Sequence, residues 1–163
     1  MIFIKYRIYF LPGLLVAIVL IFGGYIGISL GIMRYNEFLS PNAQMFMAAG
    51  KGDMTLLKKS IDQGADLNAL DLHDTALIVA CSRSNYSMAE FLLSKGADPN
   101  IIGYRGCTAL MSACGYSDLR MVKLLLAHGA KADIKCSSGQ TARDIAIQQR
   151  KNDIVEYLEN FPK

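Results

Sequence analysis

Apolar residues between positions 118 and 128 recur at the spacing of one face of an α-helix. This face carries Leu119, Val122, Leu125 and Leu126, with charged residues between them. Gly129 follows the run, and glycine readily adopts the positive φ with which many helices end. Comparable runs end at Gly64 and Gly96. We therefore predict three amphipathic helices, each ending immediately before one of these glycines.

A second set of apolar runs begins directly after three threonines, Thr75, Thr108 and Thr141. A threonine hydroxyl in this place can accept a hydrogen bond from an N–H group of the first helical turn. Each threonine is therefore predicted to start a short helix. Two of these helices carry pairs of small side chains, at Ala80 with Cys81 and at Ala113 with Cys114. We interpret these pairs as packing residues where two antiparallel helices approach closely.

These helix signals repeat at a nearly constant interval. Gly-Ala pairs begin at Gly64, Gly96 and Gly129, which are 32 and 33 residues apart. Thr-Ala pairs begin at Thr75, Thr108 and Thr141, which are 33 and 33 residues apart. The one missing residue falls between Gly64 and Thr75, where a loop tolerates a deletion. A period of this length predicts stacked helix pairs that bury their apolar faces against one another.

The repeated fragments resemble those of the ankyrin repeat family over about residues 41–163. They are GADLN, GADPN and GAKAD, then TAL, TAL and TAR, and VAC, SAC and IAI, with MFMAAGKGDMTLLKKSIDQGAD before them. The chain departs from the family pattern in two columns. Alanine replaces the proline after each threonine, and Ile78, Met111 and Asp144 stand in place of histidine.

The resemblance implies an all-α fold, an ankyrin-repeat solenoid of about four helix-pair repeats joined by short hairpin loops. We place these repeats at about residues 42–66, 67–98, 99–131 and 132–163. Residues 35–41 are predicted to be a short connector to the segment before them, residues 1–34, which has a different composition.

Residues 8–33 are 26 consecutive residues without a charged side chain. As a helix they would measure about 39 Å, which is enough to span a hydrocarbon core of about 30 Å with some tilt. We predict that residues 1–34 are an uncleaved transmembrane anchor. A cleaved signal peptide is the alternative, but its exit site would have to be the weak pair Ser29 and Gly31.

Charge gives this anchor a predicted orientation. Residues 35–163 contain fourteen Lys and Arg against fourteen Asp and Glu, so the net charge of +3 comes from Lys5, Arg7 and Arg34. Two of these three precede the apolar segment, which favours a cytoplasmic N-terminus. In a bacterium the chain would then cross the inner (plasma) membrane once and place the repeats in the periplasm. The neutral repeat region does not indicate a nucleic-acid partner.

Three glycines in the apolar segment, Gly23, Gly27 and Gly31, follow one another at intervals of four. Small residues at this spacing let two transmembrane helices pack closely, which favours association in lipid. Glycine is also generally frequent in such helices, so the pattern leaves homo-association open.

Catalytic and cofactor motifs are missing from the sequence. No phosphate-binding glycine loop or Ser-His-Asp context occurs, and His73 and His128 belong to different repeats, so we predict neither an enzyme nor a metal site nor a cofactor. Cys107 and Cys136 fall in predicted loops of neighbouring repeats. A bridge between these two thiols is left open.

The remaining function is binding of another protein. The resemblance implies that the partner lies against the concave side, formed by the hairpin tips and the first helix of each repeat. The variable positions that we select on this side are Leu72, His73, Arg83, Ile102, Tyr104, Arg105, Tyr116, Gln140 and Gln148. One hypothesis is a membrane-anchored binding module at the periplasmic surface, in its sharper form an inhibitor or immunity protein for a toxin or wall-active enzyme. The alternative is an accessory subunit of a membrane complex that makes contact through the transmembrane glycines.

Overall fold

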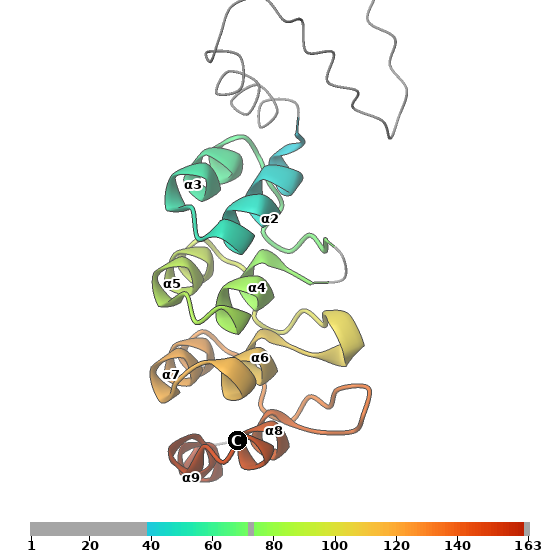
Figure 1. The fold of residues 1–163 in the computed structure, drawn as a ribbon, viewed down its shortest axis with the longest axis vertical. Coiled ribbons are helices and arrows are strands. Elements are labelled where there is room, and N and C mark those ends of the chain that lie inside the picture. The colour runs from blue at the N-terminus through green and yellow to red at the C-terminus, as the bar shows by residue number, and fades with distance from the viewer. Residues whose placement is uncertain (1–38, 72–73, 162–163) are drawn as a thin grey trace, which may run out of the picture.

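The computed structural model describes residues 39–71 and 74–161, and these residues form a stack of paired helices (Figure 1). Its elements are α2 (Pro41–Lys51), α3 (Met54–Asp62), α4 (Ala76–Ser82), α5 (Tyr86–Ser94), the 3-10 turn η1 (Tyr104–Gly106), α6 (Ala109–Tyr116), α7 (Leu119–Ala127), α8 (Ala142–Gln148) and α9 (Asn152–Asn160). Within the described residues, the one strand-like pairing is an isolated bridge between Asp71 and Asp74. The predicted all-α repeat fold is therefore confirmed for this part of the chain.

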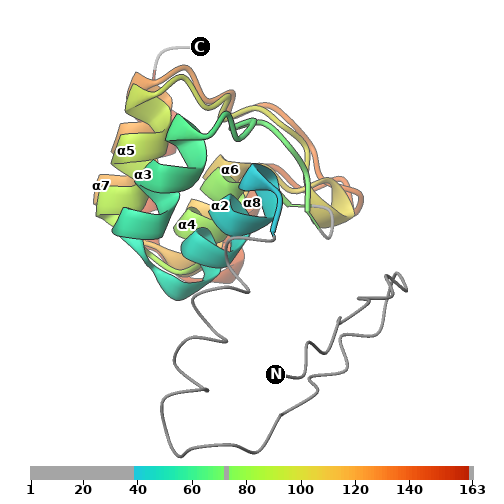
Figure 2. The same ribbon diagram turned by 90° about the horizontal axis from the view of Figure 1, so that it is seen from above.

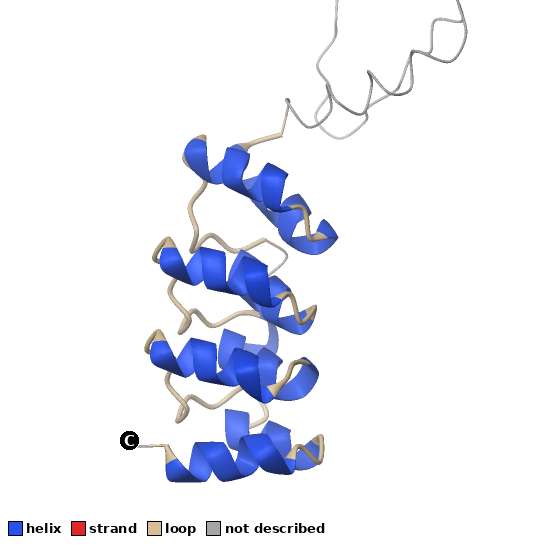
Figure 3. Ribbon diagram, turned by 90° about the vertical axis from the view of Figure 1, so that its left-hand side faces the viewer, coloured by secondary structure: helices blue, strands red, loops and turns tan. Residues whose placement is uncertain are grey.

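Two helical layers run along the stack. The inner helices α2, α4, α6 and α8 pack against one another, and the outer helices α3, α5, α7 and α9 form the second layer (Figures 1 and 3). Three hairpin loops join consecutive pairs at residues 64–75, 96–108 and 129–141, here called the first, second and third hairpin. Seen along the stack, the described residues of these hairpins extend beyond the inner helices, away from the outer layer (Figure 2).

The start and end signals of the helices are those expected from the sequence. The hydroxyl of Thr75 accepts from Ile78 N at 3.2 Å, and that of Thr108 accepts from Met111 N at 3.4 Å. Both threonines are buried, so this satisfies a first-turn N–H that water cannot reach. Gly64, Gly96 and Gly129 have φ values of 88°, 94° and 83°. The predicted glycine stops are therefore confirmed.

The core lies between the layers and between successive pairs. The largest side chains without solvent exposure include Met45, Leu57, Leu77, Leu92, Leu110 and Leu125. Cys81 and Cys114 are also fully buried, which confirms their interpretation as packing residues. Burial raises the pKa of both thiols to about 12, so both stay protonated and chemically inert at neutral pH.

A ladder of asparagines holds the hairpin bases in register. The side-chain oxygen of Asn42 accepts from Asp66 N at 2.8 Å, and that of Asn68 accepts from Asp98 N at 2.9 Å. Asn100 repeats the contact on Lys131 N at 2.8 Å. Asn68 and Asn100 are the last residues of GADLN and GADPN. Asn68 therefore ties the first hairpin to the second, and Asn100 ties the second to the third.

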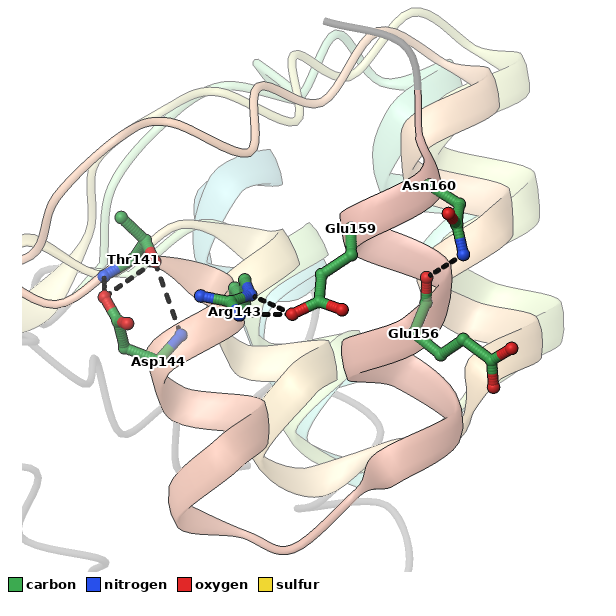
Figure 4. A network of polar contacts seen from close by, with 6 residues as sticks. All are labelled: Thr141, Arg143, Asp144, Glu156, Glu159 and Asn160. Carbon is green, nitrogen blue, oxygen red and sulfur yellow. Dashed lines mark hydrogen bonds and ion pairs between the residues drawn. The ribbon is translucent and has the colours of Figure 1, made fainter.

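The last pair closes the stack with polar side chains (Figure 4). Arg143 stands where α4 and α6 have the buried Leu77 and Leu110, and it forms an ion pair with Glu159 of α9. The pair is about half exposed, so it adds little stability, but it places charge on a face that no other described helix pair covers.

Asp144 completes this end of the stack. Its carboxylate accepts from Thr141 N at 2.8 Å, while Asp144 N donates to the Thr141 hydroxyl at 3.3 Å, which makes a capping box at the start of α8. The hydrogen bonds from the backbone and the hydroxyl of Thr141 hold the pKa of Asp144 below its usual value. This residue stands in the family's histidine column, and here it serves the helix that it belongs to.

The predicted membrane segment at residues 8–33, with Gly23, Gly27 and Gly31, lies outside the described residues. Of the helices described between residues 39 and 161, none is sufficiently long and apolar to cross a membrane. The anchor and its orientation therefore stay predictions from the sequence.

Candidate functional site

The hairpins are joined to one another by hydrogen bonds. The carboxylate of Asp74, at the end of the first hairpin, accepts from Tyr104 N of the second at 2.9 Å. Ser137 N of the third hairpin donates to the carbonyl oxygen of Arg105 at 2.9 Å. Because of these contacts, the three hairpins are linked to one another from the first to the third.

The η1 turn shapes the tip of the second hairpin. Arg105 lies in the left-handed region at φ 57° and ψ 23°, and Gly106 follows at φ 77°. Gly103 N donates to the carbonyl oxygen of Cys107 at 2.8 Å, which closes the loop. The Arg105 guanidinium carbon lies 5.9 Å from the centre of the Tyr104 ring. The turn therefore presents an aromatic ring and a cation side by side, and Tyr104 remains 57% exposed.

A groove of about 420 Å³ lies between the second and third hairpins and α8. It is lined by Arg105, Cys107, Cys136, Ser137, Ser138, Gln140 and Ile145. The wall offers a guanidinium, hydroxyls, an amide and two thiols, which can hydrogen-bond an extended peptide or a side chain. Arg105 and Gln140 are the two predicted residues that the structure brings together in this groove.

The other predicted residues lie at two further places. Ile102 is on the second hairpin and is 55% exposed. Tyr116 and Gln148 are the last residues of α6 and α8, and Arg83 follows α4 directly. The eight residues of α6 make a helix of about 12 Å, so Tyr116 lies at the far end of the inner helices from the hairpins. Leu72 and His73 lie outside the described residues.

Serine contacts fix the far end of these helices. The Ser84 hydroxyl donates to the carbonyl oxygen of Tyr116 at 2.9 Å, and the Ser117 hydroxyl donates to that of Cys81 at 2.7 Å. The backbone that carries Arg83 and Tyr116 is thus held across two repeats. The Tyr116 ring itself is 72% exposed.

Exposed apolar side chains are confined to one side of the described stack. The large apolar residues that remain exposed in this part of the chain are Leu70, Ile102, Tyr104, Tyr116 and Ile147. The first three belong to hairpins and the last two to inner helices. The outer helices of the described region contribute none.

Aromatic residues of the outer helices are instead covered by cations. The Arg120 guanidinium carbon lies 3.7 Å from the centre of the Tyr86 ring, and the Lys123 ammonium lies 5.0 Å from that of Tyr157. Lys58 and Lys95 both stand over Phe91. These cations cover the faces of the rings, so the outer layer presents charge to solvent at these places.

Several groove residues were not selected from the sequence, namely Cys107, Cys136, Ser137, Ser138 and Ile145. The repeat register held a signal for three of them, because Cys107, Ser137 and Ser138 occupy variable loop positions before a Thr-Ala pair. That they line one groove depends on how far neighbouring hairpins approach each other, which the period does not fix.

The described residues hold no group of three or more His, Cys, Asp or Glu side chains that could bind a metal ion. His128 follows α7 and is exposed. A larger hollow of about 700 Å³ lies at the C-terminal end of the stack, beside Leu158 and Phe161, and none of the predicted site residues lines it.

Two comparisons with protein-family models place this architecture among known ones. Models described as "Ankyrin repeats (many copies)" match residues 45–93 and 92–146, which together make up more than half of the chain. No curated protein matches the sequence. The first match begins within α2 and the second ends within α8, so together they span the two central helix pairs and parts of both end pairs.

Proposed function

The chain belongs to the ankyrin repeat family, whose repeats form protein–protein interaction modules, and we propose that it binds its partner through the face made by its hairpins and inner helices. The supporting observation is the distribution of exposed apolar side chains, which gather on this face of the described residues and avoid the outer helices. Exposed apolar groups with polar neighbours are typical of protein interaction sites.

The chemistry of this face suits a protein partner. Tyr and Arg are enriched at binding hot spots because they combine a large contact area with directed hydrogen bonds. Tyr104, Arg105 and Tyr116 supply these groups, and Ile102 adds an aliphatic contact. Because links between repeats fix the backbone at both ends of the inner helices, binding would order little of the protein.

We expect replacement of Tyr104, Arg105 and Tyr116 together by alanine to weaken partner binding by at least about 2 kcal/mol, or about thirtyfold in Kd. Photo-crosslinking from a photoreactive phenylalanine at position 116 identifies the partner in cells. Titration of that partner against the full-length chain in detergent or nanodiscs then gives the Kd of each variant.

The matched control carries three alanines on the outer helices, at Thr55, Glu90 and Glu156, which are all exposed. This control should keep the Kd of the unchanged protein. An unchanged Kd for the first variant, or an equal loss for both, would contradict the proposed face.

We further propose that residues 8–33 hold the repeats at the periplasmic surface of the inner membrane, where the chain acts as an inhibitor or immunity protein toward a toxin or wall-active enzyme. A small anchored binder without catalytic motifs fits such a task. The alternative role is contact within the bilayer through Gly23, Gly27 and Gly31. It makes a different prediction, because removal of residues 1–34 would then abolish partner binding, whereas binding through the hairpins and inner helices would remain.

Placement in the periplasm has its own test. Alkaline phosphatase, which is active only after export, can be fused to the C-terminus of the full-length chain. We expect phosphatase activity in intact cells, since two of the three surplus cations precede the apolar segment. A fusion that stays inactive while a cytoplasmic reporter at the same position works would remove both the periplasmic placement and the immunity role.

A further inference from the structure

Two of the four cysteines line the groove between the second and third hairpins. Cys107 and Cys136 are both partly exposed there, whereas Cys81 and Cys114 are fully buried in the helix core. All four are free thiols in the structure, so the bridge that the sequence left open is not formed. The groove therefore holds two accessible thiols, whereas the other two thiols of the protein are buried.

The backbone holds these two thiols near each other. A Cβ atom placed on Gly106 would lie 3.1 Å from the Cα of Cys136, and Ser137 N donates to the carbonyl oxygen of Arg105. Cys107 is the neighbour of Gly106, and consecutive Cα atoms are about 3.8 Å apart, so the Cα atoms of Cys107 and Cys136 lie within about 8 Å. Disulfides join Cα atoms up to about 7 Å apart, so this upper bound lies close to the span of a disulfide.

The surroundings assign the two thiols different roles. Sγ of Cys136 lies 3.0 Å from the hydroxyl of Ser138, and this hydrogen bond lowers the pKa of Cys136. Burial is the main cause that raises the pKa of Cys107, and the negative charges of Cys136 and Asp74 raise it further. Cys136 is therefore the better nucleophile. Once Cys136 is bonded to another sulfur its charge is gone, so Cys107 then ionises more easily.

We propose that Cys136 and Cys107 are a reversible thiol modification site, at which a low-molecular-weight or protein disulfide oxidises the pair and joins the two hairpins across the groove. The Cys136 thiolate attacks one sulfur of the incoming disulfide, and the other sulfur leaves as a thiol after taking a proton. Cys107 then loses its proton and attacks Sγ of Cys136, which releases the second thiol. In total, two protein thiols and one disulfide give one protein disulfide and two small thiols.

The bridge would act on the groove and on the stack together. It would enclose α6 and α7, a whole helix pair, between its two sulfur atoms. It would also draw together the walls that carry Arg105 and Gln140, so the oxidised groove is narrower than the reduced one. The reaction itself requires no binding partner, so it can be tested independently of the proposed function.

The test treats the full-length reduced protein with oxidised glutathione, alkylates the remaining thiols after denaturation, and identifies the products by mass spectrometry. We expect two of the four cysteines to resist alkylation, a cross-linked pair of peptides that contains Cys107 and Cys136, and full reversal by a reducing agent. Retention of all four free thiols would overturn the proposal. A stable glutathione adduct on Cys136 of the unchanged protein would also overturn it, because Cys107 would then be unable to reach it.

Two serine variants separate the roles. Cys107→Ser should stop after the first step and keep one glutathione on Cys136. Cys136→Ser should react at Cys107 at least about tenfold more slowly than the unchanged protein. Circular dichroism checks that both variants keep the helical fold. Equal reaction rates at the two cysteines, or a bridge that involves Cys81 or Cys114 in the folded protein, would contradict the assigned pair.

Discussion

Leu110→Ala is expected to lower the free energy of unfolding by about 3–4 kcal/mol. Leu110 has no solvent exposure and lies in α6, which packs against α4 and α8 on either side and against α7 in its own pair. Truncation removes buried methyl groups and leaves a cavity where three helix contacts meet. In a repeat stack each unit is stabilised by its neighbours, so damage at α6 weakens two interfaces between repeats at once.

Urea unfolding followed by far-UV circular dichroism measures this loss, since the chain has no tryptophan to report it by fluorescence. Ile147→Ala is the matched control, because Ile147 is also an aliphatic residue of an inner helix but is 49% exposed. Its expected cost is below about 1 kcal/mol. Similar losses for the two variants would show that α6 does not form the centre of the stack.

Most of the fold could be predicted from the sequence because its signals are local and repeated. A threonine hydroxyl caps its own helix whatever lies around it, as Thr75 and Thr108 show. A glycine at φ 94°, such as Gly96, can end a helix because it has no Cβ atom to oppose a positive φ. Three copies of such signals in register fix helix pairs, their order and the small residues between them.

The roles of the polar residues in the last described helix pair were harder to predict from the sequence. The fragment TAR has Arg143 where the other two repeats have leucine, but the role of this arginine depends on Glu159, which lies on another helix. The same limit applies to Asp144, which could be seen to replace a histidine. Its use as a capping-box residue requires the geometry of Thr141. Such residues show in the sequence as exceptions and acquire a role only in three dimensions.

The candidate face was predicted in outline, and its internal arrangement was not. The period places Tyr104 in a loop and Tyr116 at the end of the first helix of the same repeat, as the structure has them, but it does not show how neighbouring hairpins meet. It also gives no sign of the left-handed turn at Arg105, because a residue other than glycine rarely takes this conformation. The groove depends on this turn, since its carbonyl group holds the third hairpin in place.

The contact between the second and third hairpins can be tested by adding one Cβ atom, at position 106. Gly106→Ala is expected to cost about 3 kcal/mol of unfolding free energy, through two effects that a second glycine separates. At φ 77°, any side chain at position 106 is strained. Its Cβ would also lie 2.7 Å from Ser137 N and 3.1 Å from the Cα of Cys136, which are backbone atoms that cannot rotate away.

Gly139 is the matched control, because it stands one repeat later, has φ 78°, and would place its Cβ in open space. Gly139→Ala should cost only the backbone strain, about 1 kcal/mol. Urea unfolding of both variants gives the difference, about 2 kcal/mol, which belongs to the approach of the third hairpin to the second. Equal losses at the two glycines would mean that the hairpins move apart freely. The groove and its thiol pair would then have no fixed walls.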